Sequence, residues 1–291
     1  MTVDFPAGHG PVPTLAGMPD LDEKTITEAV LRAGSHGSDE RLGTVLGALV
    51  RHLHDFVREV SLTEAEWAAA IGFLTRTGQL CTPDRQEFIL LSDVLGVTML
   101  VDAVAHRRSP TATENSVLGP FFREHRPSFE AGADISGGLP GTPLSVQLTV
   151  VDTDGAPVPG AAVDVWHADS AGHYDSDVVG LEGAAMRGLF HTSADGRTSF
   201  TTISPAPYPI PDDGPVGSLM RASGRSVMRP GHLHVRIEAP GFSTLTTMLF
   251  REDDPYLEND PVFGVKGSLV ARYETHEQGE ALRHSFVLDR A

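Results

Sequence analysis

Apolar residues in the first third of the chain recur at three- and four-residue steps, the spacing that places them along one face of a helix. Within residues 41–60 this stripe consists of Leu42, Val45, Leu46, Leu49, Leu53, Phe56, Val57 and Val60. The sequence at 63–66, Thr-Glu-Ala-Glu, has the pattern of a capping box and precedes a second apolar series. A Thr-Pro pair opens a third segment, which extends over residues 82–101. We therefore predict that the first third of the chain is helical.

The apolar period changes from 3.6 to 2 after the basic pair Arg107-Arg108 and a stretch rich in Pro and Gly that runs to about residue 140. Leu144, Val146, Leu148 and Val150 alternate with polar residues, which is typical of a strand with one buried face. Further strands are predicted at 162–167, 198–203, 232–238, 245–250 and 284–288, separated by clusters of Gly, Pro and Asp. The sequence thus predicts an α+β fold, with an irregular arm at 1–20, a helical region at 21–110 and an antiparallel β-sandwich that carries the functional site at 111–291.

Charge and composition narrow the classes of function. The chain has 291 residues and a formal net charge of −17, which argues against nucleic-acid or anionic-membrane partners and favours small-molecule chemistry. We expect no membrane span and no secretory signal, because the chain lacks a long apolar run and its first 20 residues lack a basic start, and we place the protein in the cytoplasm. The single cysteine, Cys81, excludes an internal disulfide and a cysteine-based zinc site. Any metal must therefore be held by oxygen and nitrogen ligands.

Two histidines in the segment 229–237 are candidate metal ligands. In an extended strand His232 and His234 point to the same face, while the apolar residues between and after them line the other face. Two imidazoles on one face can bind one metal ion. The alternative is a strand with a polar outer face, and the HxH spacing alone does not decide between the two.

Two of the four tyrosines lie in loops that suit ligands. Tyr208 lies in a segment with four prolines, which holds a phenol at low entropic cost, and Tyr174 follows the strand predicted at 162–167. A hard, highly charged cation deprotonates a phenol, and two phenolates with two imidazoles suit ferric iron better than zinc or magnesium. The alternatives are an aromatic plug over a sheet edge for Tyr208 and an ordinary loop residue for Tyr174.

The segment R-P-G-H-L-H at 229–234 resembles the R-P-x-H-x-H strand of the intradiol ring-cleaving dioxygenases, which open catechols with non-haem Fe(III). This resemblance implies that Tyr174, Tyr208, His232 and His234 are the metal ligands and that each chain binds one Fe(III). It also implies that Tyr208 accepts a substrate proton and leaves the metal, while Arg229 stabilises negative charge on the substrate ring. By the same resemblance, we expect a homodimer formed through the helical region, with a phospholipid at the interface.

Three further stretches resemble the hydroxyquinol-cleaving members of that family, namely Leu90–Gly96, Glu114–Phe122 and Val262–Lys266. They imply that O2 and hydroxyquinol, benzene-1,2,4-triol, are the substrates and that the product is 3-hydroxy-cis,cis-muconate, or maleylacetate. The substrate-binding residues that the resemblance implies are Leu90, Asp93, Val117, Leu118, Gly119, Ile210, Pro211 and Val262.

Asp93 and Met248 bear on the choice of substrate. We hypothesise that Asp93 accepts a hydrogen bond from the third hydroxyl of hydroxyquinol, and the alternative is a helix aspartate that faces solvent. Met248 departs from the family pattern, because catechol-cleaving relatives usually have glutamine there. The nearest alternative function is catechol or chlorocatechol 1,2-dioxygenase, which is the same chemistry with another ring substituent. A remote alternative is a metal-free β-sandwich module that only binds a ligand.

Overall fold

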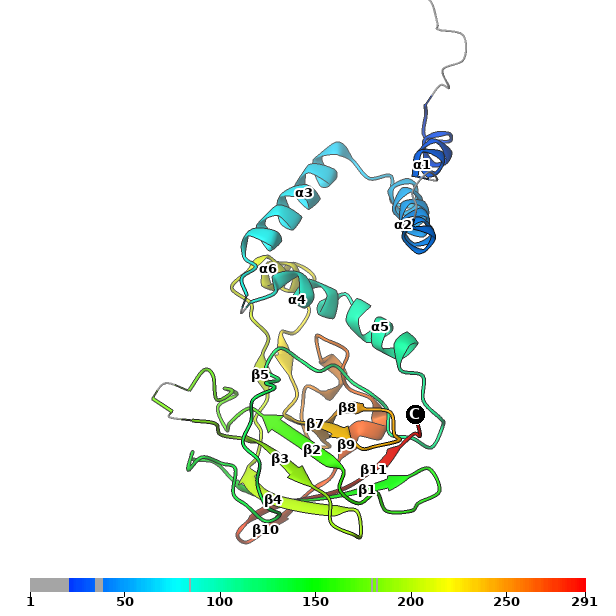
Figure 1. Cartoon of the computed structure of the whole chain (residues 1–291). Helices are drawn as coiled ribbons and strands as arrows, with labels where there is room; N and C mark the ends of the chain where they lie inside the picture. Colours follow the sequence, from blue (N-terminus) through cyan, green and yellow to red (C-terminus); the bar gives the residue numbers. More distant parts are fainter. Residues whose placement is uncertain (1–20, 35–38, 84, 179, 182) are drawn as a thin grey trace, which may run out of the picture. The chain divides into compact units, whose positions relative to one another are not determined.

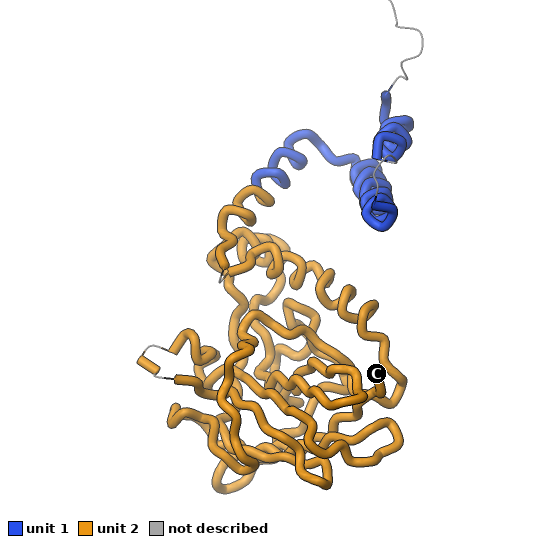
Figure 2. The backbone as a smooth tube through the Cα atoms, in the orientation of Figure 1, with its two compact units in different colours: residues 1–72 blue, residues 73–291 orange. Residues whose placement is uncertain are grey.

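The computed structural model describes residues 21–34, 39–83, 85–178, 180–181 and 183–291. The arm predicted at 1–20 lies outside the described residues. Contacts divide the chain into two compact units, residues 1–72 and residues 73–291 (Figure 2). Helix α3 (Glu64–Gln79) runs across the boundary between them.

The first unit contains helices α1 (Ile26–Gly34) and α2 (Glu40–Glu59) and the start of α3. Helix α2 matches the predicted amphipathic segment, and Asp39 caps it by accepting a hydrogen bond from the backbone N–H of Leu42 at 2.9 Å. The capping box is confirmed, since Thr63 N–H donates to Glu66 and Glu66 N–H donates back to the Thr63 hydroxyl. The apolar stripe of α2 is not covered, and its side chains are between 44% and 52% exposed.

The segment predicted at 82–101 is not one helix. Helix α4 (Glu87–Val94) and helix α5 (Val97–Ala105) meet at a bend of 78°. Gly96 lies at this bend with φ of +72°, a conformation that glycine adopts without steric cost. Apolar periodicity continued through the bend, which is why the sequence pattern did not reveal it. No single helix among the described residues is long and apolar enough to span a membrane, although the bent pair has the length and composition.

The second unit is built on two facing sheets and a short third one (Figure 1). The four-stranded sheet has the order β10 (Tyr273–His276), β11 (Gly279–Leu288), β1 (Pro143–Asp152) and β4 (Arg197–Ile203). The five-stranded sheet has the order β3 (Arg187–His191), β2 (Ala162–His167), β7 (His232–Glu238), β8 (Leu245–Arg251) and β9 (Val270–Ala271). The short sheet pairs β5 (Tyr208–Pro209) with β6 (Met228–Arg229). Helix α6 (Pro215–Ala222) and two 3-10 turns (Leu257–Asn259 and Gly267–Leu269) complete the unit.

The predicted α+β class is confirmed, but the sheets are mixed rather than purely antiparallel. Strand β1 pairs with β11 in parallel, and β8 pairs with β9 in parallel. A parallel pair needs a long crossover, and here most of the second unit lies between β1 and β11. The alternating pattern of each strand is compatible with either direction, so it could not reveal this pairing.

The main core lies between the two large sheets and fixes which way β7 faces. Leu233, Val235 and Ile237 are fully buried in this core. Each such side chain contributes about 1.5–3 kcal/mol by leaving water. Because side chains alternate along a strand, this burial turns His232 and His234 to the opposite face of the five-stranded sheet.

Candidate metal centre

The two histidines of β7 lie side by side in the interior. Their Nε2 atoms are 3.2 Å apart, and both side chains are buried. The Nδ1 atom of His232 lies 2.7 Å from the carbonyl oxygen of Pro230, which can only accept a hydrogen bond. Nδ1 therefore carries the proton, and Nε2 of His232 presents a lone pair to the centre. Burial, together with the Arg229 charge, lowers the pKa of His232 to about 3, so this imidazole is neutral.

The phenols of Tyr174 and Tyr208 reach the same point. The Tyr174 hydroxyl lies 3.2 Å from Nε2 of His234 and 3.3 Å from the Tyr208 hydroxyl. The two phenol rings stand nearly perpendicular, at an interplanar angle of 89°. Burial and the neighbouring Tyr208 raise the pKa of Tyr174 well above its ordinary value. A Tyr174 phenolate at this position therefore requires a cation beside it.

Glycines allow the loops that carry these phenols to approach one another. A Cβ on Gly172, where φ is +87°, would lie 2.7 Å from Cβ of Tyr208. A Cβ on Gly231 would lie 2.6 Å from the carbonyl oxygen of Pro205 in the proline-rich loop. The strand pairing of β5 with β6 sets Tyr208 opposite Arg229. Loop packing and register together bring the second phenol to the histidines.

The donor set fits a cation such as ferric iron. Two phenol oxygens and two imidazole nitrogens converge, and a lone pair of His232 faces His234. Nδ1 of His234 is buried with no hydrogen-bond partner among the described residues. Within those residues no group of three or more His, Cys, Asp or Glu side chains could hold a metal ion, so a metal here requires the phenols. Phenolate oxygens and neutral imidazoles suit a hard trivalent ion.

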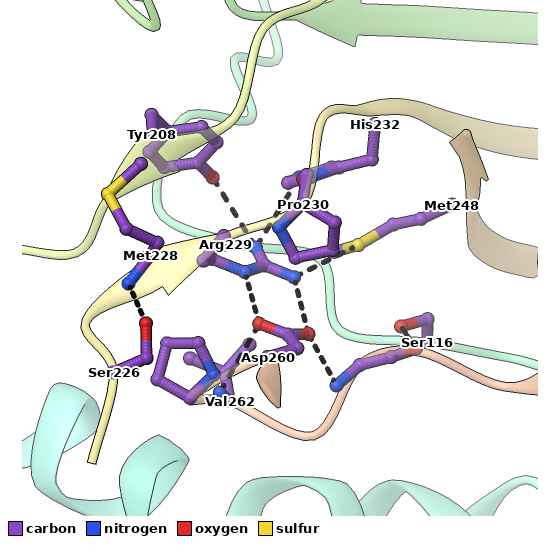
Figure 3. A network of polar contacts seen from close by, with 12 residues as sticks. Ser116, Tyr208, Ser226, Met228, Arg229, Pro230, His232, Met248, Asp260 and Val262 are labelled. Carbon is purple, nitrogen blue, oxygen red and sulfur yellow. Dashed lines mark hydrogen bonds and ion pairs between the residues drawn. The ribbon is translucent and has the colours of Figure 1, made fainter. Parts of the chain in front are cut away.

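Arg229 borders the donor set and is fixed from behind by Asp260 (Figure 3). Its Nη1 atom lies 3.4 Å from both the Tyr208 hydroxyl and Nε2 of His232. Its Nε and Nη2 atoms donate to the two carboxylate oxygens of Asp260 at 3.0 and 3.3 Å. Although burial alone would raise it, the Arg229 charge and hydrogen bonds hold the pKa of Asp260 below its ordinary value. Nη2 also lies 3.5 Å from the sulfur of Met248, the residue that departs from the family pattern, so a thioether borders Arg229 at this point.

The predicted substrate-binding residues lie at different depths in the structure. Ile210 and Val262 are buried in one apolar cluster, against which Leu90 packs. Val117 packs against a second cluster that includes Met248. Leu118 and Pro211 are exposed, and this exposure sets them apart from the buried members of the set.

Two of these residues relate directly to the centre. A Cβ on Gly119, where φ is +77°, would lie 3.1 Å from Cε1 of His234, so glycine lets the backbone lie against that imidazole. Asp93 on α4 is half-buried. Burial raises the pKa of Asp93, while a Thr98 hydrogen bond and the Arg229 charge act in the opposite direction. Whether this carboxyl binds the substrate stays a prediction.

Three residues next to the donor set were not among the predicted site residues. Asp260 is one, because 31 residues separate it from its partner Arg229. Phe121 stacks on the ring of Tyr174 with centroids 3.9 Å apart, and Trp166 stacks on His234 at 4.7 Å. Trp166 thus packs on one of the two imidazoles of the centre. Phe121 lies within the 114–122 stretch, which was the available clue.

Both parts of the chain match models of known protein families. Residues 117–290 match the family model described as "Dioxygenase", and residues 39–113 match the model described as "Catechol dioxygenase N terminus".

Curated relatives and solved structures of similar length agree with these models. The 6-chlorohydroxyquinol 1,2-dioxygenase of Cupriavidus pinatubonensis is 48% identical over 94% of this chain and 99% of that protein. The hydroxyquinol 1,2-dioxygenase of Nocardioides simplex is 50% identical over 88% of this chain and 87% of its own length. The crystal structure of hydroxyquinol 1,2-dioxygenase from Pseudomonas putida DLL-E4 superposes with a TM-score of 0.89 at 43% identity, covering 92% of this chain and 99% of that one.

Proposed function

Because the chain belongs to the intradiol ring-cleavage dioxygenase family, we propose that it inserts both atoms of O2 into hydroxyquinol to give 3-hydroxy-cis,cis-muconate, the enol form of maleylacetate. The observation that carries the chemistry is the convergence of two phenols, two imidazoles and Arg229. The names of the relatives support the substrate. Relatives named for hydroxyquinol are 44–50% identical to this chain, whereas the catechol 1,2-dioxygenase of Candida albicans is 36% identical.

Intradiol dioxygenases depend on non-haem iron, and the donor set described above supports one ferric ion per chain. Tyr174, Tyr208, His232 and His234 would hold it. A ferric ion at this site supplies a Lewis acid that binds the two adjacent hydroxyls of the substrate and activates the ring toward O2.

The chain's own residues move protons and charge around that centre. We assign the phenol oxygen of Tyr208 as the acceptor of one substrate proton, because Arg229 Nη1 lies 3.4 Å from it and can donate a hydrogen bond to the neutral phenol. The Arg229 guanidinium also donates to oxygen on which negative charge develops as the ring takes on keto character. Asp260 keeps the guanidinium in that orientation by holding its other two nitrogens.

The position of Asp93 supports discrimination of the substituent on the ring. A half-buried carboxyl group within the field of Arg229 can accept a hydrogen bond from a third hydroxyl, which catechol lacks. A site built to bind a hydroxyl rejects the analogue without it more strongly than an apolar pocket does. The test compares kcat/KM for hydroxyquinol and catechol in the wild type and in Asp93→Ala. We expect the variant to lose most of its preference for the triol, and an unchanged preference would remove Asp93 from the proposal.

The visible spectrum tests the metal centre independently of the substrate. Tyrosinate-to-Fe(III) charge transfer should colour the purified protein wine red, and oxygen uptake with hydroxyquinol, catechol and 4-chlorocatechol should rank hydroxyquinol first. A higher kcat/KM for catechol would favour the alternative of a catechol 1,2-dioxygenase. A colourless protein that iron cannot reconstitute would favour a metal-free binding module.

We further propose that two copies pair through the exposed apolar stripe of α2 and that a phospholipid binds at this interface. The stripe runs the length of the helix with no buried residue, which is the pattern of an unpaired interface. We expect sedimentation to give a dimer for the wild type and for Arg51→Glu, and a monomer for the double variant Leu49→Glu/Leu53→Glu. A monomeric wild type would contradict the pairing, and absence of phospholipid from an organic extract of the purified dimer would contradict the lipid.

A further inference from the structure

A buried arginine on β3 lies behind the phenol of Tyr174. Arg187 is 3% exposed, and its Nε and Nη2 atoms donate to the two carboxylate oxygens of Asp175 at 2.7 and 2.5 Å. Asp175 directly follows Tyr174 in the chain. This bidentate pair therefore fixes the backbone at the residue next to a metal-site phenol.

The third nitrogen of the same guanidinium contacts the residue whose ring covers Tyr174. Nη1 of Arg187 donates to the carbonyl oxygen of Phe121 at 3.0 Å. The Phe121 ring stacks on the Tyr174 ring with centroids 3.9 Å apart and an interplanar angle of 10°. The Arg187 side chain thus holds both Asp175, which follows Tyr174, and the backbone of Phe121, whose ring stacks on Tyr174.

The backbone before Arg187 is strained in a way that aims this side chain. Met186 has a φ of +55°, a left-handed conformation that non-glycine residues rarely adopt. Its N–H donates to Ile135 at 2.6 Å and its carbonyl accepts from His167 at 3.1 Å, so neighbouring segments hold the strained conformation in place. Strain that the surrounding structure maintains is typical of residues that position a functional group.

The two phenols of the centre are held by different means. The hydroxyl of Tyr208 lies against Arg229, and its loop is stiffened by prolines. Tyr174 is held through Arg187 at its chain neighbour and at its stacking partner. We propose that Arg187 is a positioning residue for the reaction, which acts through Asp175 and Phe121 to fix the direction of the Tyr174 phenol oxygen toward the metal. This inference rests on the proposed function.

The test uses iron-loaded, full-length enzyme and the variant Arg187→Lys, which keeps the charge but cannot form the two-pronged pair. The matched control is Arg251→Lys, because Arg251 at the end of β8 forms a comparable fork with Asp253 and with Glu280 of β11, and its hydrogen bonds do not involve Tyr174. The readouts are the tyrosinate-to-iron charge-transfer maximum, iron per chain, and kcat and KM for hydroxyquinol. A second variant, Phe121→Leu, removes the stack while leaving the Arg187–Asp175 pair intact.

We expect Arg187→Lys to shift the charge-transfer maximum and to lower kcat roughly 100-fold with little change in KM, since a misplacement of about 1 Å costs that much. Phe121→Leu should shift the maximum in the same direction, and Arg251→Lys should leave both readouts at wild-type values. An Arg187→Lys enzyme with the wild-type spectrum and kcat overturns the inference, as does an equal effect of Arg251→Lys. If Arg187→Lys fails to fold, an unshifted spectrum in Phe121→Leu overturns it. These failures all occur with an active, coloured wild type, whereas a colourless and inactive wild type overturns the proposed function itself.

Discussion

Replacing Asp260 by asparagine isolates what its charge does for Arg229. The carboxylate accepts hydrogen bonds from Arg229 at 3.0 and 3.3 Å and from the backbone N–H of Gly264 at 2.9 Å, all in the interior. Asparagine keeps the shape and one acceptor oxygen, but its amide nitrogen must face one of these donors. The buried guanidinium then loses its counter-charge and half of its fork.

The magnitudes follow from the burial of this pair. Removing one partner of a buried ion pair costs about 3–5 kcal/mol, and the retained amide oxygen places Asp260→Asn near the lower end. Loss of one preorganised donor to developing negative charge lowers kcat by roughly 100- to 1,000-fold. Because the pKa of Asp260 is held below its ordinary value in the folded protein, its stabilisation is present above about pH 4. That stabilisation is lost as the pH falls through the lowered pKa, so wild type and variant should converge in stability in acid.

The assay pairs steady-state kinetics on hydroxyquinol with urea unfolding, and Asp152→Asn is the control. Asp152 is also buried, pairs with Arg290 at 2.8 Å and accepts a hydrogen bond from Ala156 N–H at 2.9 Å, but it lies on β1 in the other large sheet. We expect both variants to be destabilised and only Asp260→Asn to lose kcat. Wild-type kcat in Asp260→Asn would refute the reasoning that this carboxylate orients Arg229.

Three further predictions use other buried groups. Burial lowers the pKa of His167 to about 4, so between about pH 6.5 and pH 4 the unfolded chain gains a proton that the folded chain does not. The wild type should therefore lose roughly 3 kcal/mol of unfolding free energy over this range that His167→Asn does not lose. The same pH dependence of urea unfolding in both proteins would contradict this. Glu87 is buried and accepts the N–H at the start of α6, so Glu87→Gln should cost about 2–3 kcal/mol in denaturant unfolding, whereas a loss within experimental error would contradict that anchor. Gly119→Ala should lower the iron bound per chain, because the added Cβ would press on the His234 ring. The control Gly155→Ala has a similar φ of +81° but open space around it, so it should suffer only the backbone strain. Equal iron content in the two variants would contradict the argument that Gly119 makes room for His234.

Local patterns in the sequence predicted most of the helices and strands, and two of the four proposed metal ligands. The alternation in β7 placed His232 and His234 on one face because that depends only on neighbours two residues apart. Periodicity likewise predicted α2 and the main strands. The approach of Tyr174 and Tyr208 to those histidines came only from resemblance, because it depends on how two loops fold against each other.

What the sequence could not predict depends on contacts between distant segments. Asp260 meets Arg229, and Arg187 meets Phe121, only after the sheets have assembled. The parallel pairing of β1 with β11 is of the same kind, since a strand's hydrophobic pattern carries no information on its partner's direction. The division of the chain into a helical region at 21–110 and a catalytic region at 111–291 stays a prediction.

The parallel pairing of β1 with β11 also sets the order of events during synthesis. Strand β11 lies between β10 and β1, and it contributes Leu282, Phe286 and Leu288 to the main core. A nascent chain that has not yet released residue 288 from the ribosome has a β1 with one edge open and a core that lacks the side chains of β11. The histidines of β7 are synthesised earlier, but until β11 arrives the sheet that carries them packs only on the core residues of β1 and β4. We therefore expect the proposed metal centre to be completed only after β11 has emerged, because a translation product that stops before β11 lacks part of the core on which the sheet of His232 and His234 packs.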